Sequence, residues 1–374
     1  WRNGRRRRLK ISCPMGVRVR VPLSAPQSVS AEADFLHGIA IMRKGLRRRA
    51  ALPVATPFPL SQGLLRLRHE PARQRPDPEE GTCPNMKKHP ALNALPFLSA
   101  LPGVVIGSHV MRLHQIPLSA SLQNIGALLA GGLVSFLFLT LSAPRRARSG
   151  AAPGYAAMLL CVGALGCTFL DSGIGAIHRW IRLGPLALNA AFAFVPVALI
   201  GMDLLFRSGN RRGACALSLL IGVLLFLQPD ASMSGAFAMA VLPALWHGDT
   251  DRALWRTVWG ILTVLAVLSW AWLKSPEPVA QAEGILTLAS ASGTGWWLMG
   301  LLSLAALFFP FAAGIRRQPA RLFCEGSLLF YAGLTAASCT GLFPVPVLGS
   351  GASPILGYLI SATYAVKRLN AGEG

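Results

Sequence analysis

Apolar stretches of membrane-spanning length follow one another along most of this chain, and they constrain its fold more than any other feature. Because the hydrocarbon core of a bilayer requires about 20 apolar residues in a helix, each stretch is a candidate transmembrane helix. The ten candidate spans are residues 94–111, 120–142, 152–170, 187–206, 214–227, 235–247, 256–273, 295–315, 322–342 and 350–366. We therefore predict an all-α integral membrane protein with about ten transmembrane helices over residues 86–374.

Two neighbouring candidate spans, residues 214–227 and 235–247, are shorter than the others. They flank the stretch QPDASMSG, in which Pro229 and Asp230 interrupt the apolar pattern. Irregular backbone is tolerated at membrane depth only where protein or a water-filled cavity satisfies its polar groups. We therefore expect this loop to dip into the membrane, shielded by protein.

The overall composition agrees with a membrane protein and excludes an ordinary soluble domain. Hydrophobic residues make up 53% of the 374 residues, and charged residues only 14%. The formal net charge of +21 divides into +11 for residues 1–85 and +10 for residues 86–374. The positive charge of residues 1–85 belongs to an N-terminal extension. The positive charge of residues 86–374 is explained by the basic residues in the loops between the spans.

Basic residues in the connections between the candidate spans predict the orientation. With the N-terminus in the cytoplasm, fifteen Lys and Arg residues fall on the inner side. The four on the outer side are Arg112, Arg179, Arg182 and Lys274. This excess follows the positive-inside rule. We therefore predict that both termini are cytoplasmic, and the charge of this region requires no nucleic acid or other acidic macromolecule as a partner.

Residues 1–85 differ in character from the rest of the chain. They contain no apolar run long enough to span a membrane, are rich in proline and arginine, and include the runs Arg5–Arg8 and Arg47–Arg49. The chain does not open on methionine, and Gly16–Pro26 resembles the conceptual translation of the 3′ end of a transfer-RNA gene. We expect a basic, disordered and spurious extension, with the natural start at Met86. The alternative is a basic arm that binds nucleic acid or anionic lipid.

The stretch GAIHRWIRLGPLALN places two arginines and a tryptophan between two candidate spans, on the predicted outer side. The indole of Trp180 suits the membrane interface. One interpretation is that Arg179 and Arg182 only anchor the chain by reaching lipid headgroups. The other is a cationic site in which the planar guanidinium groups bind the phosphate oxygens of an outer-leaflet lipid.

Four motifs, in the same order, resemble the SEDS family of shape, elongation, division and sporulation proteins, which includes FtsW and RodA. The motifs are Arg179–Pro185 (RWIRLGP), Leu227–Asp230 (LQPD), Glu277–Gly295 and Phe343–Leu356. Arg179–Pro185 resembles the family's RW-I-x-LG segment, and Leu227–Asp230 resembles its QPD motif. Glu277–Gly295 resembles the outer loop that contains DP, YQ-x-x-QS and GSGG. Phe343–Leu356 resembles the LPLP-x-x-SYGGSS element. The resemblance covers essentially all of the chain from Met86 onward.

Membership of this family would imply a ten-helix fold in the bacterial cytoplasmic membrane and a role in peptidoglycan biogenesis, cell division or cell shape. The best-known members polymerise lipid II beside a partner penicillin-binding transpeptidase. That chemistry needs a carboxylate base and cationic groups for the leaving pyrophosphate. The candidate residues for binding a polyprenyl-pyrophosphate-linked precursor are Arg179, Trp180, Arg182 and Asp230. We expect no cofactor, and no metal, because the cysteines lack metal-ligand spacing.

The chain departs from the family where the chemistry is expected. In the family the outer loop continues past GSGG to an HTDF-like segment whose aspartate is regarded as catalytic, whereas here Ser292–Gly295 run directly into Trp296 and the next span. The YQ-x-x-QS stretch becomes Ala282–Thr287, which retains a carboxylate. Glu283 and Glu277 are therefore the candidates for a replacement base, with a solvated surface role as the alternative. These departures argue against polymerase activity.

Two further carboxylates lie in or beside candidate spans. Besides binding a precursor, Asp230 has the alternative role of an N-cap, in which its carboxylate accepts backbone N–H groups of the following helix. We place Glu325 as the one carboxylate inside a span. Arg321, four residues earlier, would face it on the same helix, so an intrahelical ion pair is expected.

Three functions remain open from the sequence. In the first, the protein is an active peptidoglycan glycosyltransferase that uses lipid II and an unrecognised base. In the second, it retains the fold and the lipid site without the reaction and acts as a binding or scaffold protein of envelope growth. In the third, the likeness is one of fold only and the helices transport a solute or lipid. The missing catalytic segment favours the second function.

Overall fold

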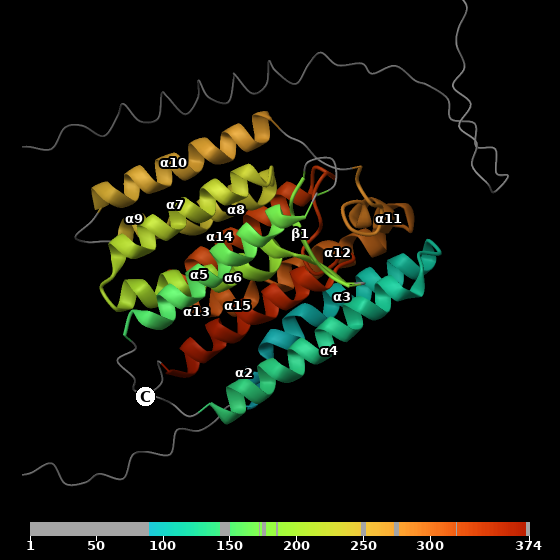
Figure 1. The fold of residues 1–374 in the computed structure, drawn as a ribbon. Helices are drawn as coiled ribbons and strands as arrows, with labels where there is room; N and C mark the ends of the chain where they lie inside the picture. Colours follow the sequence, from blue (N-terminus) through green and yellow to red (C-terminus); the bar gives the residue numbers. More distant parts are fainter. Residues whose placement is uncertain are drawn as a thin grey trace, which may run out of the picture. The chain divides into compact units, whose positions relative to one another are not determined.

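The computed structural model describes most of the predicted membrane region (Figure 1). The described residues are 90–142, 150–171, 173, 177–184, 186–247, 252–272, 277–318 and 320–371. The predicted N-terminal extension, residues 1–85, and the predicted start at Met86 lie outside the described residues.

Helices form nearly all of the described secondary structure, as predicted. The helices are α2 (Pro90–Asn93), α3 (Leu95–Leu113), α4 (Leu118–Leu141), α5 (Ala152–Cys167), η2 (Thr168–Leu170), α6 (Ala190–Arg207), α7 (Arg211–Leu227), α8 (Ala231–Val241), α9 (Ala244–His247), α10 (Arg252–Ala271), α11 (Ile285–Ala291), α12 (Thr294–Ala306), α13 (Phe309–Ile315), α14 (Arg321–Ser338) and α15 (Ala352–Ala371). Within the described residues, the exception is a β hairpin of β1 (Trp180–Leu183) and β2 (Leu186–Asn189). Each predicted span overlaps one helix or two consecutive helices, and the span predicted from residue 187 also includes part of β2.

Six stretches are long and apolar enough to cross a membrane, judged by length and composition. They are α3, α4, α5 with η2, α6, α10, and the stretch of α12 and α13. The helices α7, α8, α14 and α15 occupy the other predicted spans, but they are shorter or more polar. The chain is therefore a multi-pass membrane protein, while the full count of ten spans stays a prediction.

The helix backbones approach one another closely at small residues in the centre of the bundle. α5 packs along α6, and a Cβ atom added at Gly201 would lie 2.8 Å from the carbonyl oxygen of Gly154. α15 meets α6 in the same way, since a Cβ atom at Gly357 would overlap the carbonyl oxygen of Phe192. Glycine at these positions therefore lets the helices pack backbone against backbone, as is typical of membrane helix pairs.

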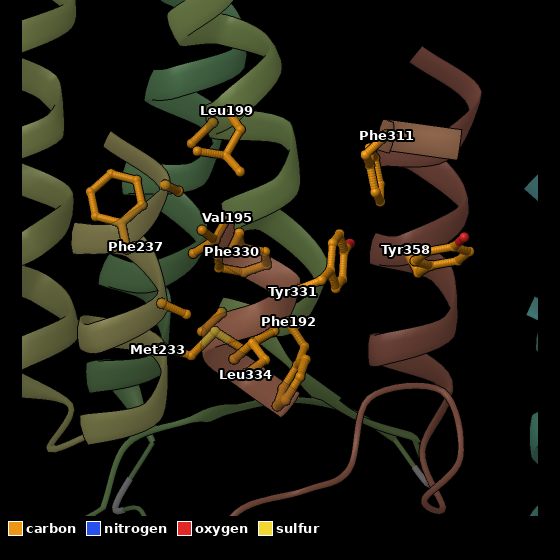
Figure 2. Packing of buried hydrophobic residues seen from close by; sticks show 14 of the residues in the cluster. Phe192, Val195, Leu199, Met233, Phe237, Phe311, Phe330, Tyr331, Leu334 and Tyr358 are labelled. Carbon is orange, nitrogen blue, oxygen red and sulfur yellow. The ribbon is translucent and has the colours of Figure 1, made fainter. Parts of the chain in front are cut away.

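Aromatic side chains fill the core between α6, α8, α13, α14 and α15 (Figure 2). Phe311 of α13 stacks on Tyr331 of α14 with ring centroids 5.4 Å apart, and Tyr358 of α15 meets Tyr331 edge-on at 5.3 Å. The hydroxyl of Tyr358 donates to Ser99 Oγ at 2.7 Å, and that of Tyr331 donates to Ser361 Oγ at 3.3 Å. Both buried hydroxyls are thus paired, which avoids the cost of an unsatisfied polar group in apolar surroundings.

The carboxylate of Asp203 lies inside α6, so the sequence-based placement of Glu325 as the one carboxylate within a span was wrong. Asp203 Oδ2 accepts from Arg207 Nε at 2.7 Å, from the hydroxyl of Tyr364 at 2.7 Å and from Arg368 Nη2 at 3.2 Å. Because buried charges persist only when they are paired, this network explains the carboxylate. Arg207, four residues after Asp203, was the signal available in the sequence.

Glu325 does pair with Arg321, as predicted, and it has two further partners. Arg321 Nε lies 2.7 Å from Glu325 Oε1. The other carboxylate oxygen accepts from Trp246 Nε1 at 2.9 Å and lies 2.8 Å from His247 Nε2. Glu325 therefore joins α14 to α9, in addition to pairing within its own helix.

The connection between α7 and α8 is shorter than the predicted loop. α7 ends at Leu227 and α8 begins at Ala231, so only Gln228–Asp230 separate them. The predicted start of the second span, at residue 235, was too late because the small and polar residues ASMS were assigned to the loop. Asp230 starts the helix earlier by capping it.

Candidate functional site

The β hairpin, the turn Gln228–Asp230, residues 277–293 and residues 343–351 are joined by direct contacts. We call this part of the molecule the hairpin end. In the hairpin, Trp180 pairs with Asn189 in an antiparallel register, and Gly184 turns the chain with φ +63°. This left-handed conformation favours glycine because it has no Cβ atom.

The hairpin is anchored to two helices through Asn189. Its side-chain oxygen accepts the backbone N–H of Phe192 at 3.2 Å and so caps α6. Its own backbone N–H donates to Ser353 Oγ, in the first turn of α15, at 2.9 Å. The predicted candidate residues Arg179, Trp180 and Arg182 therefore stand on a fixed element.

Arg179 is buried, with 4% of its side chain exposed. Its Nη2 donates to the carbonyl oxygen of Pro229, and its Nε lies 3.4 Å from Asp230 Oδ2. The guanidinium carbon lies 5.9 Å from the ring centroid of Phe343. The sequence predicted a cation here, but its ion pair with Asp230 joins residues 51 positions apart and could not be read from the sequence.

Arg182 is the exposed arginine of the hairpin. Its side chain is 58% exposed, and its Nε lies 3.2 Å from Oδ2 of Asp171, which is itself 34% exposed. Trp180, on the same strand, is half-buried. The two arginines of the predicted site thus have different surroundings, because Arg179 points into the protein and Arg182 is accessible from outside.

Asp230 is an N-cap, as the alternative interpretation predicted, and also the partner of Arg179. Its Oδ1 accepts from the backbone N–H of Met233 at 3.2 Å and from Ser232 Oγ at 2.9 Å. The side chain is only 2% exposed. Its charge is therefore stabilised by the helix N-terminus as well as by Arg179.

Glu283 is half-buried in the loop before α11, whereas Glu277 is exposed. Glu283 Oε2 accepts the backbone N–H of Val279 at 2.8 Å. Burial raises the pKa of Glu283 above its ordinary value, while hydrogen bonds from the backbone and the positive charge of Arg179 oppose that shift. Of the two candidate bases, Glu283 is thus the one held in a defined position.

Residues 343–351 form a wall that is held from both sides. The backbone N–H groups of Val345 and Ser350 donate to the carbonyl oxygens of Ala282 and Gln281 at 3.2 and 2.7 Å. On the other side, Asn124 Nδ2 of α4 donates to the carbonyl oxygen of Gly349 at 2.9 Å, and its Oδ1 accepts the backbone N–H of Gly351 at 2.9 Å. These contacts fix residues 343–351 between α4 and the loop before α11.

Asn124 also belongs to the hairpin end, and it was not predicted from the sequence. It lies among apolar residues of α4 and is fully buried. A buried amide in a membrane helix needs hydrogen-bond partners, so its position in a candidate span was a usable signal.

An apolar cavity of about 430 Å³ opens between α8, α10 and α14. Ser232, the residue that donates to Asp230, lines it at the hairpin end. Trp270 lines it as well and contacts Phe343 edge-on, with ring centroids 5.2 Å apart. The Arg179–Asp230 pair is therefore connected to this cavity through Ser232 and Phe343.

The turn between α11 and α12 consists of Ser292 and Gly293. His114, the residue directly after α3, contacts this turn: its Nε2 lies 2.9 Å from Ser292 Oγ and 3.0 Å from the carbonyl oxygen of Leu288. His109 stacks on Trp296 at the start of α12, with ring centroids 4.3 Å apart. α11 and α12 are thus joined by a turn of only two residues.

Comparison with known proteins detects a likeness in structure. No protein-family model and no curated protein matches the chain. The crystal structure of the rod-shape-determining protein RodA from Thermus thermophilus matches with a TM-score of 0.51 and 19% identity, over 72% of this chain and 94% of RodA. A point mutant of the same protein matches with a TM-score of 0.51 and 21% identity, over 75% of this chain and 97% of that one.

The chain has a RodA-like fold. The predicted resemblance to the SEDS family is therefore confirmed in the fold, and it extends over nearly the whole length of RodA. At this level of identity the likeness concerns the arrangement of the helices and leaves the reaction to be argued from the residues.

Proposed function

We propose that the protein is a SEDS-like component of bacterial cell-envelope biogenesis in the cytoplasmic membrane, acting in cell division or cell shape. In this proposal it binds a polyprenyl-pyrophosphate-linked peptidoglycan precursor and does not polymerise it. The exposed guanidinium of Arg182, on a hairpin anchored to α6 and α15 of a RodA-like fold, carries the proposal. A penicillin-binding transpeptidase is the protein partner that this role calls for.

The pyrophosphate of such a precursor needs cationic groups at the membrane surface. Arg182 offers planar donors that match phosphate oxygens, and Trp180 beside it suits the interfacial region. In the sequence resemblance, the short turn at Ser292 and Gly293 stands where the family's loop with its catalytic aspartate is expected. Binding without polymerisation is the function that accounts for both features.

Lipid binding by the full chain in nanodiscs tests this function. We expect a polyprenyl-pyrophosphate-linked disaccharide to bind more tightly than phosphatidylglycerol, and we expect Arg182→Gln to weaken that binding about tenfold. The matched control is Arg112→Gln, which changes an exposed arginine at the end of α3. Equal binding of the two lipids, unchanged by Arg182→Gln, would refute the proposal and leave the arginine as an anchor.

Glu283 supports a second candidate function, that of an active glycosyltransferase. In that reaction Glu283 would accept the proton of the attacking sugar hydroxyl while the bond between the anomeric carbon and the polyprenyl pyrophosphate breaks. Its half-buried carboxylate and raised pKa favour proton uptake. Glycan product in the same nanodiscs, abolished by Glu283→Gln with lipid binding retained, would establish this function in place of the first.

A further inference from the structure

Arg179 and Arg182 each lie beside an aspartate, and the two arginines differ in burial. Arg179 directs its guanidinium to Pro229 and Asp230 and is 4% exposed, whereas Arg182 is 58% exposed. The two arginines lie three residues apart on the chain, and the sequence predicts one cationic site that contains both. The buried Arg179 is suited to a structural role, and the exposed Arg182 is suited to binding a ligand.

Arg179 joins three segments of the hairpin end. Its carbonyl oxygen accepts the backbone N–H of Ala190 at 3.0 Å, which closes the hairpin against the start of α6. Its side chain fastens the same point to the turn between α7 and α8 through Pro229 and Asp230. The start of β1 is therefore fixed by both the backbone and the side chain of one residue.

Asp230 is well placed to hold that side chain. Its carboxylate is fixed at the N-terminus of α8 by Met233 and Ser232, so it presents a stationary charge to Arg179. A phosphate that displaced Asp230 would have to reach a guanidinium with almost no exposed surface. It would also leave the carboxylate buried without its cationic partner, which costs several kcal/mol.

We infer that Arg179 is a positioning residue, paired with Asp230, that holds the hairpin so that Arg182 is presented to the lipid phosphate. Arg179 itself does not contact the lipid. The inference rests on the proposed function for its lipid readout, and its structural part is independent of it. In the RWIRLGP segment, Arg182 thus binds the lipid and Arg179 holds the hairpin in position.

A double-mutant cycle in the full chain tests the inference. Arg179→Gln combined with Asp230→Asn removes both charges together, and asparagine retains the helix cap. This neutral-pair variant is combined with Arg182→Gln, and binding of the polyprenyl-pyrophosphate-linked disaccharide is measured in nanodiscs. We expect about a tenfold loss from the neutral pair alone and no further loss when Arg182 is already glutamine.

Two outcomes of that cycle overturn the inference. Equal losses in both backgrounds would mean that Arg179 binds the lipid directly, and unchanged binding in the neutral-pair variant would mean that the pair does not position Arg182. By contrast, wild-type binding that does not distinguish the disaccharide lipid from phosphatidylglycerol would refute the proposed function itself.

Hydrogen exchange tests the positioning role without any lipid. We expect the neutral-pair variant to speed exchange of the amides of Trp180–Leu183 and Leu186–Asn189, and Arg182→Gln to leave them unchanged. The amides of α15 serve as an internal reference for global unfolding. Unchanged exchange in the hairpin of the neutral-pair variant would overturn the structural part of the inference.

Discussion

At the residue scale, the acidic side chains of the hairpin end differ in how deeply they are buried and in how their charge is compensated. Asp230 is buried beside Arg179 and at a helix N-terminus, so its charge is compensated. Glu283 is only half-buried, and lost hydration raises its pKa against the opposing effect of the Val279 N–H and Arg179. Relative to the unfolded chain, the fold favours the neutral form of Glu283, which links the protonation of this side chain to stability.

The stability of the protein should therefore fall in one pH window because of Glu283. Since the pKa is raised on folding, the folded state binds more protons than the unfolded state from roughly pH 4.3 up to the folded pKa, and stability falls as pH rises through that window. Glu283→Gln removes this dependence. We expect the apparent Tm of the variant, relative to wild type, to increase between about pH 4 and pH 7. Parallel Tm profiles would contradict the assignment.

At the scale of the elements, close backbone contacts hold the helices in place. Gly154 and Gly201 bring α5 and α6 together, and Gly357 does so for α15 and α6. The buried side chains labelled in Figure 2 fill the space between α6 and the helices α8, α13, α14 and α15. The elements thus depend on small residues as much as on large apolar ones.

Adding one methyl group at the α5–α6 contact should destabilise the protein. A Cβ atom at Gly201 would lie 2.7 Å from Met158 Cγ and 2.8 Å from the Gly154 carbonyl oxygen. We expect Gly201→Ala to cost about 1–3 kcal/mol, seen as a lower apparent Tm. The matched control is Gly163→Ala in α5, where no atom lies within 4 Å and the better helix propensity of alanine applies. Equal Tm values for the two variants would contradict the packing argument.

Hydrophobic length predicted the helices well, because a membrane helix satisfies its own backbone and is recognised from local composition. The hairpin was missed, and the predicted span from residue 187 began three residues before α6, at Ala190. The hairpin depends on the turn at Gly184 and on the hydrogen bond from Asn189 to Ser353. Ser353 lies far away in the sequence, so a local stretch of sequence does not reveal this contact. The sequence was sufficient to predict which residues are candidates for the site. Their interaction partners could be identified only from the folded structure.

At the scale of the whole molecule, polar networks join distant parts of the chain. Arg179–Asp230 joins the hairpin to the α7–α8 turn, and Asp203 joins α6 to α15 through Tyr364 and Arg368. Each network links residues far apart in sequence at a buried carboxylate. In apolar surroundings such pairs fix which helices meet, since an unpaired charge there is costly.

Removing the carboxylate of Asp203 should loosen α15 from α6. Asp203→Ala leaves the guanidinium groups of Arg207 and Arg368 without their shared acceptor, and we expect a loss of about 3–5 kcal/mol. The apparent Tm of the variant in detergent reports this loss. Asp171→Ala is the control for removing a partly exposed carboxylate, with an expected loss of about 1 kcal/mol or less. Similar Tm values for the two variants would show that the network does not hold the helices.

The two-residue turn between α11 and α12 has an evolutionary consequence. Gly293 is exposed, no atom lies within 4 Å of the position that a Cβ atom would take there, and the ends of both helices are adjacent. Exposed turns of this kind accept inserted segments without disturbing the elements they connect. A lineage with this fold could therefore gain or lose a whole loop at this position through one insertion or deletion while the rest of the protein stayed in place.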